Sequence, residues 1–155
     1  MLFRSWEDKK ANLTMLEKKI MGLEADAQLV ILPEMFSTGF TMNATQFAET
    51  MDGDTVKWMA EMSQKKRIIL TGSIIIAEDD NFYNRLLWVM PDGSIGTYDK
   101  RHLFAFAGED NHYSAGSQRL VTSVNGMKIN LQICYDLRFP VWARQQEASE
   151  YDVLV

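Results

Sequence analysis

The sequence predicts an α/β layered fold with a mixed sheet, formed as one domain. Three observations predict this fold class: an amphipathic helical pattern close to the N-terminus, continuous apolar runs of strand length, and turn signals that join later strands into hairpins. Helical patterns alternate with apolar strands early in the chain, and hairpins dominate later. Since the 155 residues contain neither an internal repeat nor a linker, their length and organisation fit a single domain.

The first half of the chain predicts two helices and two strands. Apolar side chains recur every three or four residues from Asp8 to about Leu23, which indicates an amphipathic helix. The continuous apolar run at 27–34 predicts a strand buried on both faces. A second helix is predicted from Asp54 to Lys66, with an acidic residue that favours the helix start, and 67–76 is the next strand.

The second half of the chain predicts two hairpins, a loop and a further helix. The hairpins pair 82–90 with 95–100 and 119–124 with 127–133. The first has the turn signal "PDGS", and the second has Asn125-Gly126, which favours a type I′ turn. Between them, 101–118 predicts a loop with one helical turn. A helix from Pro140 to about Ala148 and a strand at 151–155 complete the prediction.

The composition excludes several classes of function. A net charge of −5 and a pI near 5.0 argue against a nucleic-acid binder, because such a protein needs a basic face to displace counterions from phosphates. The apolar runs are too short to span a membrane, and the N-terminus lacks the uninterrupted apolar segment typical of a signal peptide, so we expect a cytoplasmic protein. One cysteine cannot form an internal disulfide, and His102 and His112 lack a usual ligand spacing, so we expect no metal and assign these histidines no role.

The stretch "INLQICYDLRFP" holds Cys134, the only cysteine. A strand followed by a tight turn and a helix projects the residue at the bend out of the sheet, as in nucleophile elbows. At an ordinary thiol pKa near 8.5, only about 3% of the group is ionised at pH 7, so a nucleophile needs a nearby cation, base or helix N-terminus. A packing role stays open on this motif alone, because free cysteine is among the most buried residue types.

Three further side chains are candidates for the same chemistry. Glu34 ends an apolar strand, where reacting groups collect in open α/β sheets, and is a candidate general base. Lys100 follows a short strand and is a candidate for stabilising a thiolate and an oxyanion. Glu109 lies in a loop long enough to reach over a pocket, with Asp110 as the competing acid. Taken alone, each of these residues also fits an ordinary solvated position.

Four blocks occur together in one order: "LPEMFSTGF", "YDKRHLF", "GEDNHYSAG" and "ICYDLRFPVWAR". Together they resemble the glutamate, lysine and cysteine blocks of the nitrilase superfamily, the carbon-nitrogen hydrolases, and are most similar to the omega-amidase group. The resemblance extends from Trp6 to Val155. It implies an α-β-β-α sandwich of the nitrilase type, no metal or organic cofactor, and a homodimer in which the sheets of two subunits stack.

The resemblance also implies roles at the matching positions. Glu34 is implied as the general base, Lys100 as the cation beside the tetrahedral oxyanion, and Cys134 as the nucleophile that forms a thioester. Glu109 matches a second glutamate that positions the substrate and the lysine. The backbone N–H of Tyr135 is a candidate second donor to the oxyanion.

The expected substrate is a small-molecule omega-amide of the 2-oxoglutaramate type, hydrolysed to the acid and ammonia. The carboxylate of such a substrate requires a cationic partner, for which Arg138 is the candidate. An ion pair of Arg138 with Asp136 or Glu147 is an equally open interpretation. Phe36 and Tyr135 are candidate pocket walls, although aromatic residues beside strand ends are often part of the core.

The chain departs from the family pattern at both ends. Relatives of this kind open with a strand before the tryptophan that matches Trp6, and they continue beyond the strand at 151–155. We therefore expect residues 1–155 to form a partial carbon-nitrogen hydrolase domain, incomplete at the C-terminus and without the first strand. The alternative function is a truncated, catalytically inactive fragment that acts as an interaction or dimerisation module through its exposed sheet.

Overall fold

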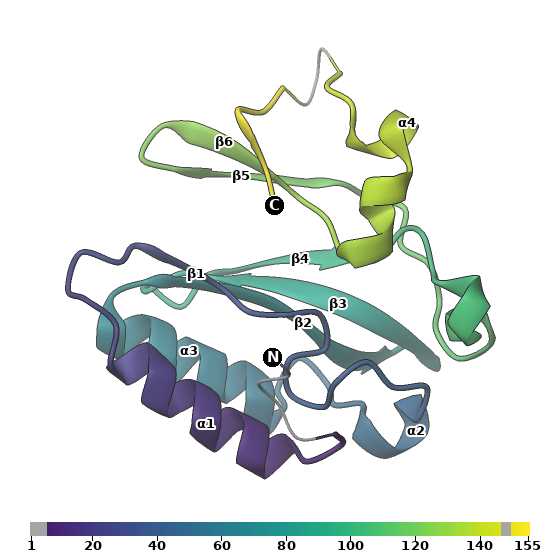
Figure 1. Cartoon of the computed structure of the whole chain (residues 1–155), viewed down its shortest axis with the longest axis horizontal. Coiled ribbons are helices and arrows are strands. Elements are labelled where there is room, and N and C mark those ends of the chain that lie inside the picture. Colours follow the sequence, from purple (N-terminus) through teal and green to yellow (C-terminus); the bar gives the residue numbers. More distant parts are fainter. Residues whose placement is uncertain (1–5, 147–149) are drawn as a thin grey trace.

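Stacked layers of helices and sheets form the protein in the computed structural model, which describes residues 6–146 and 150–155 (Figure 1). Helices α1 (Lys9–Met21) and α3 (Asp54–Lys66) cover one face of a four-stranded sheet, and a three-stranded sheet lies over its other face. The predicted α/β fold class is confirmed. Of the second helical layer implied by the resemblance, the described residues form only one short helix, α4 (Pro140–Ala143).

The four-stranded sheet is mixed, as predicted. Its strands follow the order β1 (Leu29–Ile31), β2 (Ile69–Glu78), β3 (Asn81–Val89) and β4 (Ile95–Asp99). β1 runs parallel to β2, and the other neighbours are antiparallel. Asp79 and Asp80 join β2 to β3 with φ of 49° and 61°. Two successive residues with left-handed backbone give this turn the twist that matches a hairpin.

The three-stranded sheet contains the second predicted hairpin. β5 (Leu120–Val124) and β6 (Met127–Leu131) are antiparallel, and β7 (Val153–Leu154) runs parallel to β6. Asn125 and Gly126 join β5 to β6 with φ of 50° and 83°. This left-handed backbone is that of a type I′ turn, so the prediction from the Asn-Gly pair is confirmed.

Short helices connect the layers. They are α2 (Ala44–Phe47), the 3₁₀ helices η1 (Ala105–Ala107), η2 (Glu109–Asn111) and η3 (Cys134–Arg138), and α4. Helices η1 and η2 lie in the loop predicted at 101–118, which confirms the helical turn expected there. No helix in the described part of the chain is long and apolar enough to cross a membrane.

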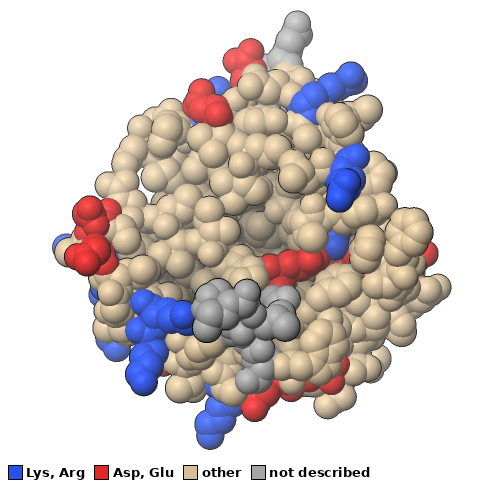
Figure 2. Space-filling model, viewed as in Figure 1, with Lys and Arg blue, Asp and Glu red and all other residues tan. Residues whose placement is uncertain are grey.

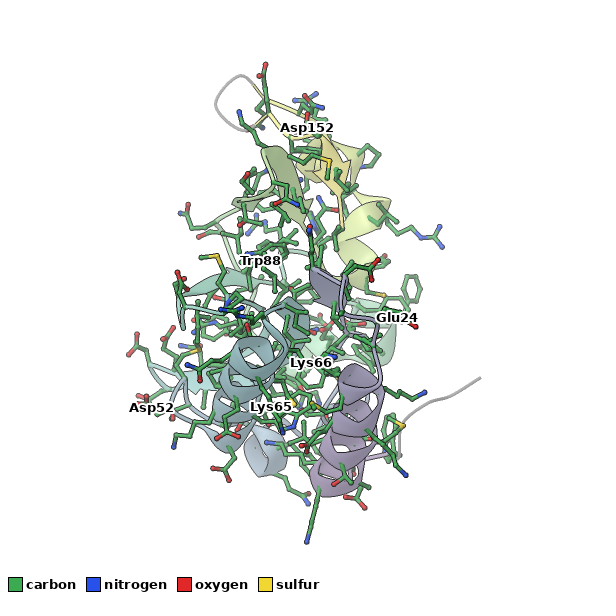
Figure 3. All side chains as sticks on the ribbon, turned by 90° about the vertical axis from the view of Figure 1, so that its left-hand side faces the viewer. Glu24, Asp52, Lys65, Lys66, Trp88 and Asp152 are labelled. Atoms are coloured by element: carbon green, nitrogen blue, oxygen red, sulfur yellow. The ribbon has the colours of Figure 1, made fainter. Side chains whose placement is uncertain are left out.

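Among the described residues, two apolar cores lie between the layers, and a third, smaller one includes Met35, Ala44, Ile75 and Tyr113. The core between the helices and the four-stranded sheet includes Leu16, Ile20, Val56, Met59, Leu70, Ile74 and Leu87. The core between the two sheets includes Leu86, Trp88, Tyr98, Ile129, Leu131 and Ile133. Figure 3 shows Trp88 between the helical layer, marked by Lys65 and Lys66, and the second sheet, marked by Asp152. Because successive side chains of a strand point to opposite faces, β3 contributes to both cores.

Two predictions are wrong in detail. The strand predicted at 27–34 is only the three-residue β1 and is not buried on both faces, since its Ile31 is 55% exposed. Among the described strands, β1 pairs with β2 alone and therefore has an open edge. The helix predicted to reach about Ala148 ends at Ala143, because Arg144 adopts extended backbone and the polar residues after it offer no apolar face for packing. Residues 147–149 lie outside the described residues.

Candidate active site

Three strand ends converge on one cavity. Glu34 follows β1, Lys100 follows β4 directly, and Cys134 lies beyond the end of β6. All three line a cavity of about 500 Å³, so side chains far apart in the sequence meet at one place. Figure 2 shows one face of the molecule hollowed near its middle, with acidic atoms in the hollow.

A strained turn follows Glu34 and fixes the end of its strand. Met35 has left-handed backbone with φ of 45°, which is uncommon for a non-glycine residue. Met35 N donates to Ser73 Oγ at 2.9 Å, and Phe36 N donates to the Ser73 carbonyl oxygen at 3.2 Å. These two hydrogen bonds to Ser73 of strand β2 therefore fix the position of the backbone next to Glu34.

Lys100 is a buried cation between two carboxylates. Its Nζ donates to Glu34 Oε1 at 2.7 Å and to Glu109 Oε2 at 2.8 Å. The Lys100 and Glu109 side chains are 1% and 0% exposed, whereas that of Glu34 is 16% exposed. Of the two carboxylates, Glu34 is therefore the one that faces the cavity. The ring of Phe40, with its centroid 5.4 Å from Nζ, adds a cation–π contact.

Asn84 on β3 joins the same two carboxylates, and sequence reasoning missed it. Its Nδ2 donates to Glu34 Oε1 at 2.9 Å and to Glu109 Oε1 at 3.0 Å. The available signal was a single amide inside the apolar run "FYNRLLWVM", because a buried polar side chain requires hydrogen-bond partners. The backbone N–H of Phe104 donates to Glu109 Oε2 at 2.6 Å, so Glu109 has three donors.

These charges set the protonation states of the site. Burial lowers the pKa of Lys100, but the charges and hydrogen bonds of Glu34 and Glu109 outweigh burial, and the pKa lies above its ordinary value. Burial raises the pKa of the Cys134 thiol, and the charge and hydrogen bond of Glu34 raise that pKa further, while Lys100 offsets only part of the increase. The site therefore places a cation with a raised pKa and a thiol with a raised pKa beside the same glutamate.

Cys134 lies at a tight turn and is exposed, so the packing interpretation is wrong. Its φ of 43° is in the left-handed region, and the 3₁₀ helix η3 begins there. The elbow is therefore a strand followed by one 3₁₀ helix rather than by a long helix. The fully buried Asp136 holds this turn, because its Oδ2 accepts hydrogen bonds from Ile133 N at 3.1 Å and from Tyr98 Oη at 2.6 Å.

Asp136 also connects the cysteine block to the lysine block. Its Oδ1 accepts the backbone N–H of His102 at 2.8 Å and lies 2.8 Å from His102 Nδ1. The His102 ring stacks on Phe139 with 3.7 Å between the centroids. Asp136 is thus a partner of His102 and not of Arg138, and Glu147 lies outside the described residues.

The remaining wall of the cavity is aromatic and carries one cation. Phe40, Phe104 and Tyr135 line this wall together with the exposed Arg138. Tyr135 and Arg138 are therefore at the cavity, where the sequence predicted them, whereas Phe40 and Phe104 were missed. Within the described ranges, no group of three or more His, Cys, Asp or Glu side chains could hold a metal ion.

Phe36 does not line the cavity, which corrects its prediction as a pocket wall. Its ring is 1% exposed and belongs to the core between the helices and the sheet, 6.0 Å from the ring of Trp58. The left-handed turn at Met35 directs the chain so that Phe36 packs on the helical side. Phe40, four residues later, occupies the wall instead.

Similarity to known proteins agrees with this geometry. The sequence model of the carbon-nitrogen hydrolase family matches residues 3–155. The chain belongs to the carbon-nitrogen hydrolase family. The omega-amidase YafV of Yersinia enterocolitica is 42% identical over 148 residues, which cover 96% of this chain and 56% of that protein. The 2-oxoglutaramate amidase of Bacillus subtilis (strain 168) is 30% identical over 131 residues, which cover 83% of this chain and 51% of that protein.

Solved carbon-nitrogen hydrolase structures share the fold. XC1258 of Xanthomonas campestris, a superfamily protein with an arsenic adduct in its active site, has a TM-score of 0.91 at 40% identity and is matched over 96% of this chain and 58% of its own. Nit3 of Saccharomyces cerevisiae, a member of branch 10 of the nitrilase superfamily, has a TM-score of 0.79 at 28% identity, over 92% and 56% of the two chains. The resemblance to the nitrilase superfamily is confirmed. The chain spans little more than half the length of these relatives.

Proposed function

We propose that this chain carries the catalytic centre of a cysteine-dependent amidase, which hydrolyses a small omega-amide of a 2-oxo acid to the acid and ammonia. The observation that carries the proposal is the meeting of Cys134, Glu34 and Lys100 at one cavity, with 2.7 Å between Lys100 Nζ and Glu34 Oε1. The relatives named omega-amidase and 2-oxoglutaramate amidase support the same reaction class. The substrate proposed is therefore 2-oxoglutaramate or a close analogue.

Acylation starts from the neutral thiol. Glu34 accepts the proton of Cys134 while the sulfur attacks the amide carbonyl carbon. The Lys100 ammonium and the backbone N–H of Tyr135 stabilise the oxyanion of the tetrahedral intermediate. Glu34 then transfers its proton to the leaving nitrogen, and the C–N bond breaks. Ammonia departs, and the acyl group remains on Cys134 as a thioester.

Deacylation uses the same groups with water as the nucleophile. Glu34 takes a proton from the water that attacks the thioester carbonyl, the C–S bond breaks, and the proton passes to the sulfur of Cys134. Lys100 again stabilises the oxyanion and stays protonated, because its carboxylate neighbours raise its pKa. Asn84 and Glu109 hold the glutamate and the lysine in place through both half-reactions.

Ammonia release from 2-oxoglutaramate tests the proposed reaction. The chain is expected to release ammonia, and the Cys134→Ala variant is expected to be at least about 1000-fold slower, because the nucleophile is lost. Thermal unfolding of both proteins serves as the control for correct folding. Equal rates of ammonia release from the two chains would contradict a role of the thiol.

Arg138 is the proposed partner of the substrate carboxylate. It lines the cavity, and no ion pair to its guanidinium is formed by the described residues. Arg138→Met keeps an unbranched apolar stem and removes the charge. This variant is expected to raise KM for 2-oxoglutaramate about 10- to 100-fold with a smaller change in kcat, since a charge-assisted hydrogen bond to the substrate is lost.

Two comparisons make the Arg138 result specific. A neutral amide without a carboxylate should have the same KM in the wild type and in Arg138→Met. Arg144→Met, at an exposed arginine outside the cavity, should leave both substrates unaffected. An equal increase in KM for the charged and the neutral amide would show that Arg138 does not recognise the carboxylate.

A second candidate function rests on exposed apolar surface. Ile31 on the open edge of β1 is 55% exposed, and Leu137 and Val141 are 63% and 67% exposed. Since such surface favours association, we propose a homodimer formed by sheet stacking. A chain without amidase activity would then act as an interaction module through the same surface. Analytical ultracentrifugation of the wild type is expected to give the mass of a dimer, and Val141→Lys should shift the population toward the monomer. A wild type that stays monomeric at every concentration would contradict dimerisation. Location in the cytoplasm stays a prediction.

A further inference from the structure

A second, smaller cavity reaches the same reacting side chains. It has a volume of about 280 Å³, and Glu34 and Cys134 line both this cavity and the larger one. Its other walls come from β1, β2, β3 and the ends of the second sheet, so the cavity lies between the two sheets. The thiol is therefore bordered by two spaces with different walls.

Thr71 presents a buried hydroxyl to the smaller cavity. The β2–β3 register pairs Thr71 with Trp88, whose ring belongs to the core between the sheets. Directly opposed residues share a face of the sheet, so Thr71 also faces the second sheet. Thr71 is 0% exposed, and its Oγ1 has no hydrogen-bond partner among the described residues.

The amide of Gln132, which also lines the smaller cavity, is in the same condition. Gln132 is 8% exposed, and its Nε2 and Oε1 lack a hydrogen-bond partner within the described part of the chain. Buried polar groups are nearly always hydrogen-bonded to protein or to ordered water. A cavity of about 280 Å³ is large enough for several waters, since each water occupies about 30 Å³ in the liquid. The unsatisfied groups of Thr71 and Gln132, which line the same cavity, therefore indicate bound water there.

Charge separates the roles of the two cavities. Arg138 and Lys100 line the larger cavity, whereas the described residues around the smaller one include no lysine or arginine and carry the charge of Glu34. An acyl chain that bears a carboxylate is therefore favoured in the larger cavity and disfavoured in the smaller one. Small neutral molecules such as water and ammonia fit the smaller cavity.

We propose that the smaller cavity receives the departing ammonia and then supplies the water that cleaves the thioester, with Thr71 as a positioning residue for that water. This inference rests on the amide hydrolysis proposed above. The water oxygen bonds to the acyl carbon and one water proton passes to Glu34. The C–S bond then breaks, and the same proton moves to the sulfur of Cys134. The acid and the free thiol are the products, with no further reactant.

Thr71→Val tests this role because it keeps the side-chain shape and removes the hydroxyl. Ammonia leaves before deacylation, so the variant is expected to release the first equivalent of ammonia at the wild-type rate. Later turnovers should be about tenfold slower, as the loss of one hydrogen bond predicts. Intact mass spectrometry at steady state should then detect an acyl adduct on Cys134. Thr71→Ser should behave like the wild type, and so should Thr97→Val at an exposed position of β4.

The outcomes separate this inference from the reaction on which it rests. A wild-type chain that releases no ammonia would overturn the hydrolysis and the inference together. If the wild type is active, two results for Thr71→Val would overturn the inference alone. One is turnover at the wild-type rate, and the other is slower release of the first equivalent of ammonia without an accumulated adduct. A crystal structure of the wild type needs no variant: an ordered water on Thr71 Oγ1 supports the assignment, and a dry cavity overturns it.

Discussion

Replacing Lys100 with methionine is expected to lower kcat by at least about 1000-fold and the free energy of unfolding by about 3–5 kcal/mol. Methionine retains an unbranched stem but removes the ammonium that lies 2.7 Å from Glu34 and 2.8 Å from Glu109. Because Glu109 is fully buried, its carboxylate loses the cation at a place that water does not reach. The oxyanion loses its charged donor in the same substitution.

Two comparison variants separate charge from packing in this experiment. Lys65→Met, at an exposed position of α3 (Figure 3), should change neither activity nor stability. The double variant Lys100→Met/Glu109→Gln removes the uncompensated buried charge, so it should regain much of the lost stability and stay inactive. Urea unfolding measures the stabilities. A Lys100→Met protein that unfolds at the wild-type urea concentration would contradict the buried ion network.

Replacing Glu34 with glutamine is expected to change turnover and thiol reactivity in opposite directions. Turnover should fall about 100- to 10,000-fold, because the group that moves the proton in both half-reactions is lost. Alkylation of Cys134 by iodoacetamide at neutral pH should become faster. The charge and hydrogen bond of Glu34 raise the pKa of the thiol and Lys100 lowers it, so the substitution leaves the lowering effect less opposed.

The pH dependence of alkylation shows whether Glu34→Gln lowers or raises the pKa of the Cys134 thiol. In the wild type the alkylation rate should rise mainly above the pH at which an ordinary cysteine ionises, because the thiol pKa is raised. In Glu34→Gln the rise should move to lower pH. Each unit of decrease in pKa gives about ten times more thiolate, but each thiolate is about threefold less nucleophilic. The alkylation rate is therefore expected to rise about threefold per unit. Asp110→Asn, an exposed acid beside Glu109, is the matched control. A Glu34→Gln profile displaced to higher pH would contradict the assignment.

The positions of the three proposed catalytic residues could be predicted because each follows a strand. Strand ends in layered α/β folds meet at a common edge, and Glu34, Lys100 and Cys134 all lie there in the structure. The preference for Glu109 over Asp110 came from the block resemblance, and Glu109 is the one that binds Lys100 while Asp110 is exposed. Local sequence patterns and block order were sufficient for these positions.

The other residues of the site depend on contacts between elements. Asn84 is a single amide in an apolar strand, and the folded sheet brings it to Glu34 and Glu109. Phe36 was expected at the cavity but is buried in the core on the helical side. The chain turns there through the positive φ of Met35, and local patterns do not predict a positive φ for a non-glycine residue. The exposure of Ile31 likewise follows from which strands pair with β1, a property of the folded sheet and not of the strand itself.

Intact mass spectrometry of the chain mixed with 2-oxoglutaramate is the most direct test of a thiol, an ammonium and a carboxylate that act on one carbonyl group. After a rapid acid quench, we expect a transient mass increase equal to the acyl group. Peptide mapping should place it on Cys134, and Cys134→Ala should lack it. Ammonia release without any adduct, at a rate that Cys134→Ala leaves unchanged, would contradict the proposed chemistry.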